Sequence, residues 1–212
     1  MSREQELLWK SDAGESFFEE RPITAETVRN RTDFLEEALS KTSQIATAIE
    51  FGAGNGLGLK ALRSLYPKAS LAAIELNAAV AKALPKDIEV WIGSALDYES
   101  TVKYDLVLTT GFLMCISPED LEKAYTRLYN ACSRYLLLAE YHLSQRAQMP
   151  WRHVELVGNG YSQRATMHLT FADHAGAMLE AYQDLHLKDY GFAYHLGRYA
   201  QPDFTWFLIE RY

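Results

Sequence analysis

A glycine-rich loop between two acidic residues is the feature of this sequence best suited to chemistry. Gly52, Gly54 and Gly56 follow a short apolar segment and precede a run with helical character. Glycines let the chain turn sharply and let a ligand approach the backbone, and the helix start behind them offers unpaired N–H groups. Glu50 precedes the glycines, and Glu75 ends the next apolar segment. The pattern predicts a ligand site at this loop.

The spacing of the glycines separates this loop from two common nucleotide-binding motifs. The dinucleotide fingerprint is G-x-G-x-x-G, whereas here the third glycine comes one residue early. The lysine and hydroxyl residue of a P-loop do not follow. A carboxylate at Glu50 would repel phosphate but suits a cation, and an acid at Glu75 can accept hydrogen bonds from a ribose. Together they indicate S-adenosylmethionine, in preference to a plain glycine turn beside a solvated acid.

Short apolar segments alternate with helical ones around this loop, which predicts parallel βαβ units in a sheet covered on both faces. The expected strands are 45–51, 70–76, 88–92, 104–109 and 135–140, and the expected helices are 24–39, 57–66, 78–84, one capped by Ser117, and 171–182. Two final strands, 185–195 and 204–211, have no helix between them and are expected to pair antiparallel. The fold class is therefore α/β, with a mostly parallel, Rossmann-like sheet of seven strands and a C-terminal antiparallel hairpin. We expect a single domain over 1–212, with N-terminal cap helices in 1–40.

The glycine loop and its two acids resemble the cofactor site of the class I S-adenosylmethionine-dependent methyltransferases. In that family the loop backbone holds the methionine part and the second-strand acid holds the ribose. The resemblance implies a cofactor site that includes Glu50, Gly52, Gly54, Gly56, Glu75, Leu76, Ser94, Ala95 and Thr110. Asp97 is a second candidate, beside Ser94, for the adenine contact. Trp9, with Phe17 and Phe18, either closes over the cofactor as a lid or packs as an ordinary amphipathic segment.

A closer resemblance extends over most of the chain from about residue 8 onward. Segments 104–118, 133–141, 189–195 and 205–208 are similar to the methylases associated with pseudaminic acid biosynthesis. This implies methyl transfer to an oxygen or nitrogen of a nonulosonic sugar, a sugar nucleotide or a surface-glycan precursor. The resemblance departs at 143–170, which we therefore expect to be an acceptor-binding insertion. The alternative is a non-catalytic partner protein of a glycan-biosynthesis pathway that binds the cofactor.

The acceptor side is expected beyond the carboxyl ends of the strands, where ligands bind in open α/β sheets. Glu140, Tyr141 and His142 come directly after a strand and are the candidate catalytic residues. Imidazole titrates near neutral pH, so His142 is the first candidate for a base, or else a hydrogen-bonded loop histidine. Glu140 either orients the acceptor or pairs with an arginine. Candidate acceptor-binding residues are Arg152, Arg164, Tyr194, His195 and Arg198. The three arginines would suit a carboxylate or phosphate if they converge, and otherwise are isolated surface residues.

Composition excludes several classes of protein. The net charge is −7, which disfavours nucleic acid as a partner because phosphates call for a basic surface. Two cysteines cannot form a disulfide scaffold, and no CxxC pair suggests a metal site. No apolar run reaches the length of a membrane span. We expect a cytoplasmic monomer or homodimer that binds a small-molecule acceptor.

Overall fold

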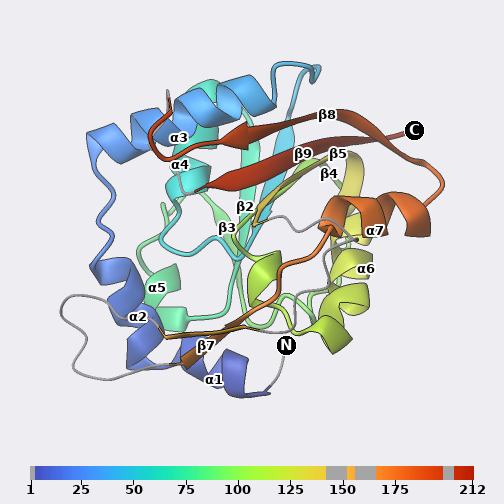
Figure 1. Ribbon diagram of the computed structural model, residues 1–212. Coiled ribbons are helices and arrows are strands. Elements are labelled where there is room, and N and C mark those ends of the chain that lie inside the picture. The colour runs from blue at the N-terminus through green and yellow to red at the C-terminus, as the bar shows by residue number, and fades with distance from the viewer. Residues whose placement is uncertain (1–2, 142–151, 156–165, 198–202) are drawn as a thin grey trace.

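A seven-stranded sheet forms the centre of the molecule (Figure 1). The computed structural model describes residues 3–141, 152–155, 166–197 and 203–212. Along the sheet the strand order is β3-β2-β1-β4-β5-β9-β8, and the first five strands of that order run parallel. Their bounds are β1 Thr47–Phe51, β2 Ser70–Glu75, β3 Glu89–Ile92, β4 Tyr104–Thr110, β5 Cys132–Glu140, β8 Leu185–Ala193 and β9 Phe204–Arg211. Strand β9 runs antiparallel to both β5 and β8, so the predicted fold class and hairpin are confirmed.

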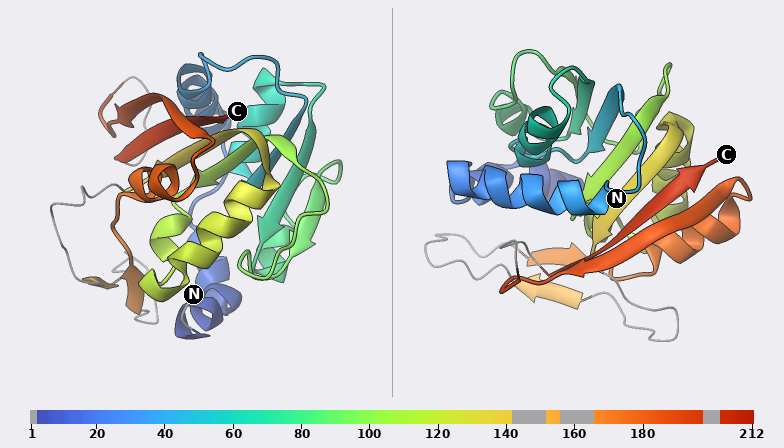
Figure 2. Two further views of the ribbon diagram at one scale, coloured as in Figure 1. Left: turned by 90° about the vertical axis from the view of Figure 1, so that its right-hand side faces the viewer. Right: turned by 90° about the horizontal axis from the view of Figure 1, so that it is seen from above.

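Helices cover both faces of the sheet because neighbouring strand residues point to opposite faces. Leu106 and Leu108 of β4 pack in one apolar cluster, and Val107 between them packs in the other. The first cluster includes residues of α3 (Ala25–Ala38) and α4 (Leu57–Leu65), and the second includes residues of α6 (Leu121–Ala131) and α7 (His174–Ala181). Figure 2 shows the sheet between these two layers of helices. The short α5 (Ala78–Ala81) follows β2.

Two N-terminal helices lie at the ends of β1 and β2. We call α1 (Arg3–Lys10) and α2 (Asp12–Glu19) the cap. The side-chain amide of Asn77, just after β2, donates to the carbonyl of Trp9 at 2.9 Å. The amide of Asn55, in the glycine loop after β1, donates to the carbonyl of Arg21 at 3.0 Å. The cap therefore covers the carboxyl ends of β1 and β2.

The structure differs from the sequence prediction in two places. Within 143–170, where no periodicity was visible, β6 (Arg152–Glu155) and β7 (Thr166–Leu169) pair antiparallel as a separate two-stranded sheet. The helix expected at Ser117 begins as a 3-10 turn over Pro118–Asp120, and α6 follows it. The hydroxyl of Ser117 donates to Asp120 at 2.7 Å instead of capping the helix N–H groups. Within the described ranges, none of the helices is long and apolar enough to cross a membrane.

Arg211 fastens the end of β9 to the end of α6. Its guanidinium donates to the carbonyls of Tyr129 at 3.0 Å and Cys132 at 2.9 Å. It also pairs with the carboxylate of Asp184 at 2.8 Å. The carbonyl of Tyr129 also accepts the backbone N–H of Cys132, so Arg211 adds charged donors at a helix end where carbonyls have few partners.

We expect Arg211→Met to lower the free energy of unfolding by about 2–3 kcal/mol, because several acceptors lose a charged donor. Lys123→Met is the matched control, since the pair of Lys123 with Asp97 is exposed. Lys123→Met should lower the free energy of unfolding by less than about 0.5 kcal/mol. Urea unfolding of both variants measures the difference, and equal effects would contradict the assigned role of Arg211.

Candidate active site

A cavity of about 680 Å³ opens beside the carboxyl ends of the parallel strands, next to the cap. Its volume suits a ligand the size of a nucleotide, since ligand pockets usually measure about 300–1,000 Å³. Most of the expected cofactor residues line it. Those lining residues are Trp9, Glu50, Gly52, Gly54, Glu75, Leu76, Ala95 and Thr110, and Tyr141 joins them from the acceptor side.

Glu50 is a buried carboxylate that faces this cavity. A Cβ on Gly58 would lie 2.4 Å from its Oε1, so the carboxylate rests directly against the backbone of α4. Burial raises the pKa of Glu50 to about 7, while the positive charge of Arg31 opposes that rise. Its Oε2 has no hydrogen-bond partner in the described part of the chain. Glu50 is thus ready to accept a cationic group from a ligand.

Arg31 is a site residue that the sequence analysis missed. It projects from α3 into the cavity lining and is only 7% exposed. Burial lowers the pKa of its guanidinium, and its Nε has no hydrogen-bond partner among the described residues. It shares the buried face of α3 with Phe34, Leu35 and Ala38. A charged residue on an otherwise apolar helix face was the signal that could have revealed it.

Glu50 and Arg31 together present opposite charges to one cavity. A zwitterion such as the methionine part of S-adenosylmethionine carries both an ammonium and a carboxylate. The ammonium fits Glu50 and the carboxylate fits Arg31, because Glu50 Oε2 and Arg31 Nε, which have no hydrogen-bond partner among the described residues, each gain one of opposite charge. The residues present therefore fit the cofactor predicted from the sequence.

Glu75 connects the glycine loop to the end of β2. Its Oε2 accepts the backbone N–H of Gly54 at 2.7 Å, and its Oε1 accepts that of Asn77 at 2.8 Å. Burial raises the pKa of Glu75, and these backbone N–H groups oppose the rise. Each oxygen keeps a second lone pair, so the same carboxylate can also accept ribose hydroxyls.

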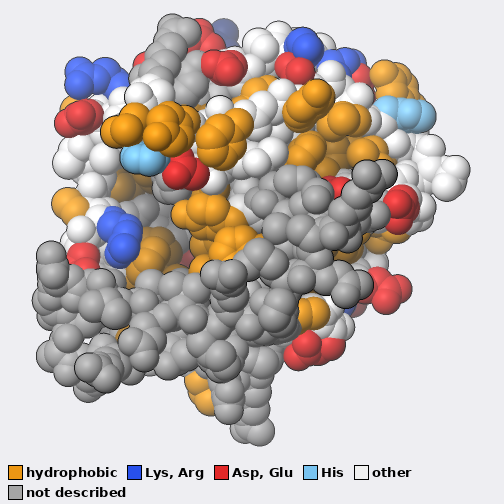
Figure 3. Space-filling model, in the orientation of Figure 1, with side chains coloured by type: hydrophobic (Ala, Val, Ile, Leu, Met, Phe, Trp, Pro, Cys, Tyr) orange, Lys and Arg blue, Asp and Glu red, His pale blue; other side chains and the backbone are white. Residues whose placement is uncertain are grey.

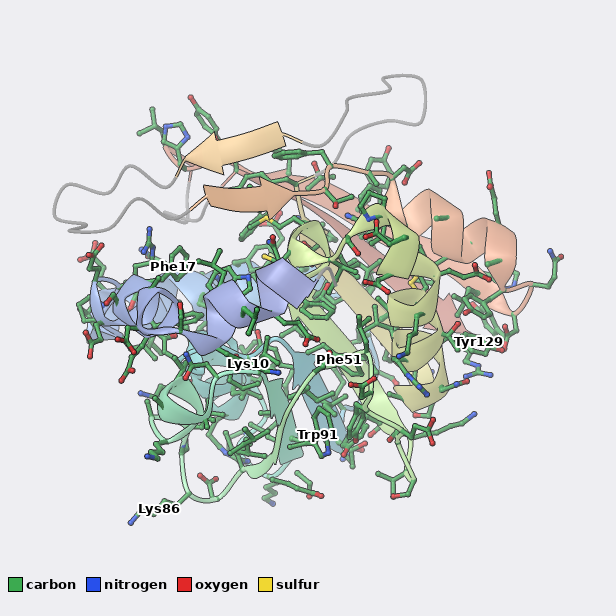
Figure 4. All side chains as sticks on the ribbon, turned by 90° about the horizontal axis from the view of Figure 1, so that it is seen from below. Lys10, Phe17, Phe51, Lys86, Trp91 and Tyr129 are labelled. Carbon is green, nitrogen blue, oxygen red and sulfur yellow. The ribbon has the colours of Figure 1, made fainter. Side chains whose placement is uncertain are left out.

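The cap packs directly on the glycine loop. Gly54 has φ +54°, and a Cβ there would lie 2.4 Å from a ring carbon of Phe18. The ring of Phe17 is centred 5.3 Å from that of Trp9 and 5.2 Å from that of Phe18. Figure 4 shows Phe17 on the cap and Phe51 at the end of β1. Glycine at position 54 therefore lets the cap close one side of the cavity.

Three aromatic residues form another part of the cavity lining. The ring of Tyr141 is centred 5.8 Å from that of Phe171 and 5.3 Å from that of Phe204, and all three residues line the cavity. Glu140 precedes Tyr141 but does not line the cavity. Its carboxylate instead accepts backbone N–H groups from the loop after β4.

The remaining candidates lie elsewhere. Gly56 has φ +85° and caps α4, and Ser94 is buried outside the cavity lining. Asp97 is exposed and pairs with Lys123. Tyr194 and His195 follow β8, and His195 pairs with Asp203 at 3.0 Å. Exposed hydrophobic side chains gather on the face of the molecule shown in Figure 3. Arg152 lies in β6, while His142, Arg164 and Arg198 lie outside the described residues.

Solved structures share this fold. DesVI of Streptomyces venezuelae is 14% identical over 95% of this chain and 98% of its own, with a TM-score of 0.66. A 1,6-didemethyltoxoflavin-N1-methyltransferase of Burkholderia thailandensis is 15% identical over 100% of this chain and 90% of its own, with a TM-score of 0.65. CalS10 of Micromonospora echinaspora is an amino pentose methyltransferase of calicheamicin biosynthesis, solved with S-adenosylmethionine. It is 12% identical over 93% of this chain and 96% of its own, with a TM-score of 0.64. No protein-family model and no curated protein matches the chain.

Binding of a cation at Glu50 should depend on pH. Because the pKa of Glu50 is about 7, the carboxylate is mostly protonated at lower pH, and binding must then expel a proton. Calorimetric titration with S-adenosylhomocysteine should show affinity falling at least tenfold from roughly pH 8 to 6. Glu50→Gln should bind weakly, and its affinity should fall about tenfold less than that of the wild type over the same range. An affinity that is the same at both pH values would contradict the role of Glu50.

Proposed function

We propose that this chain is an S-adenosylmethionine-dependent methyltransferase that acts on a small-molecule acceptor. The observation that carries the proposal is the pair of buried opposite charges, Glu50 and Arg31, which line one cavity. Glu50 Oε2 and Arg31 Nε have no hydrogen-bond partner within the described part of the chain. The glycine loop and Glu75 complete a site for an amino acid joined to a nucleoside. The solved methyltransferases with the same fold support this function.

Different residues of the chain would bind different parts of the cofactor. Glu50 binds the ammonium and Arg31 the carboxylate, while Glu75 accepts the ribose hydroxyls. Leu76 and Ala95 supply apolar walls for the adenine. When bound, the cofactor supplies a methyl group on a positively charged sulfur. The protein's task is then to align the acceptor with that methyl group, because in-line displacement depends on orientation.

The acceptor would bind at the aromatic part of the cavity. Tyr141, Phe171 and Phe204 form a surface for the apolar face of a ring, and the cap, whose Trp9 packs in one cluster with Phe171, would help to exclude water. His142 is our candidate for a base, needed only where the acceptor must lose a proton. Leu169 of β7 also lines the cavity, which supports 143–170 as the acceptor-binding insertion.

For the acceptor itself we propose a nonulosonic sugar, its nucleotide or a related surface-glycan precursor. The segments similar to methylases associated with pseudaminic acid biosynthesis support this assignment, with Arg152, Arg164 and Arg198 available for an acidic group. One solved relative in fold is named an amino pentose methyltransferase. Cys115 and Cys132 are free thiols, which agrees with a reducing cytoplasm.

Replacement of Arg31 tests the cofactor site. Arg31→Met should weaken binding of S-adenosylmethionine by about 1.5–3 kcal/mol, because its carboxylate loses a charge-assisted partner. Binding of decarboxylated S-adenosylmethionine should stay unchanged in the same variant. Arg29→Met, on the exposed side of α3, is the matched control and should bind both ligands like the wild type.

Calorimetry of these ligand and variant pairs makes the comparison. An equal loss of affinity for both ligands in Arg31→Met would contradict the proposed contact between Arg31 and the ligand carboxylate. A wild-type protein that binds neither S-adenosylmethionine nor S-adenosylhomocysteine would contradict the proposed function.

A further inference from the structure

The loop between β4 and α6 forms one wall of the cavity, and it contacts both ends of the site. Its lining residues are Gly111, Phe112, Met114 and Cys115. Phe112 packs so closely against the glycine loop that a Cβ on Gly52 would lie 2.7 Å from its ring. At the other end, the carbonyl of Met114 accepts the N–H of Thr170, just after β7, at 2.7 Å. We call residues 111–115 the wall loop.

One carboxylate holds the wall loop in place. Glu140 Oε1 accepts the backbone N–H groups of Phe112 and Leu113, each at 3.1 Å, and its Oε2 accepts that of Met114 at 3.3 Å. Glu140 is 3% exposed, and no lysine or arginine of the described residues forms an ion pair with it. Its negative charge is thus stabilised by the amides that it organises.

We propose that Glu140 is a positioning residue whose ionised carboxylate fixes the wall loop, and with it the geometry between cofactor and acceptor. The inference rests on the proposed function. Protonation removes the charge and replaces one acceptor site of the carboxylate by an O–H donor, so the hydrogen bonds that hold the three amides become weaker. A shift of about 1 Å at a reacting site can cost about a hundredfold in rate, so the loop needs such an anchor.

The ionisation of Glu140 falls in the neutral range. Burial raises its pKa to about 7, and the wall-loop amides oppose that rise. Tyr125 from α6 and Cys115 from the wall loop interact with Glu140, and burial raises the pKa of both, so they stay protonated. His174 from α7 hydrogen-bonds Tyr125 at 2.8 Å, and Glu50 titrates across the cavity. The test must separate Glu140 from these last two groups.

The first experiment follows the backbone amides directly. In ¹H–¹⁵N spectra of the wild type between about pH 5.5 and 8.5, the resonances of Phe112, Leu113 and Met114 should shift together with a midpoint near 7. The shift should persist in His174→Gln and in Glu50→Gln. Amides that do not titrate in the wild type, or that still titrate in Glu140→Gln, would overturn the proposal.

The second experiment measures what the anchor does for binding, with S-adenosylhomocysteine as the probe. At roughly pH 8, Glu140→Gln should bind about tenfold more weakly than the wild type, the worth of about one hydrogen bond. The ratio should approach one near pH 6, where the wild type has lost the same charge. Titration of Glu50 affects both proteins equally and cancels from the ratio.

The outcomes separate this proposal from the proposed function. A ratio that stays at one, or one that does not change with pH, would contradict the anchoring role of Glu140. A wild type that binds no S-adenosylhomocysteine counts against the methyltransferase assignment, while the amide titration still tests Glu140. If Glu140→Gln does not fold, the wild-type spectra and their His174→Gln and Glu50→Gln controls decide the question.

Discussion

Buried carboxylates at the ends of parallel strands hold together the loops that form the cavity. Glu75 and Glu140 end β2 and β5, Glu50 is the last residue but one of β1, and all three are almost fully buried. Glu75 accepts an N–H of the glycine loop, and Glu140 accepts three from the wall loop. A buried charge is costly unless it is hydrogen-bonded, so each carboxylate requires the loop conformation that supplies its donors. The shape of the site follows from this requirement.

The same constraint distinguishes Glu50 from the two carboxylates that hold the loops. Glu75 and Glu140 receive backbone donors on both of their oxygens. Glu50 differs, since one of its oxygens lacks a partner among the described residues, and it faces Arg31 across the cavity lining. Raised carboxyl pKa values recur at functional sites because burial destabilises the charge that the site needs. A cationic ligand would stabilise the buried negative charge of Glu50.

Much of the fold could be predicted because the pattern is local. The apolar strand 104–109 and the glycine loop each identify their own element from a few consecutive residues, and the alternation of such elements predicts a parallel sheet. Glu50 and Glu75, the acids beside the glycine loop, could likewise be assigned to the cavity from the sequence. Glu140 was expected in the site as a strand-end acid, but its role depends on a loop far away in sequence. No local pattern contains that contact.

Other site features depend on tertiary packing in the same way. Arg31 reaches the cavity only because α3 packs against the sheet next to the glycine loop, and a helix pattern alone does not say which neighbour its buried face meets. The strands β6 and β7 are short and irregular in composition, so they carry little periodic signal. Tyr194 and His195 are candidate acceptor-binding residues from the sequence, and the structure adds that both are exposed after β8.

A crystal structure of the complex with S-adenosylhomocysteine tests the central claim most directly, because it shows which charge meets which end of the ligand. The account predicts the ligand amino group at Glu50, its carboxylate at Arg31 and its ribose hydroxyls at Glu75. A ligand seated with its adenine between Glu50 and Arg31, or bound outside this cavity, would contradict it.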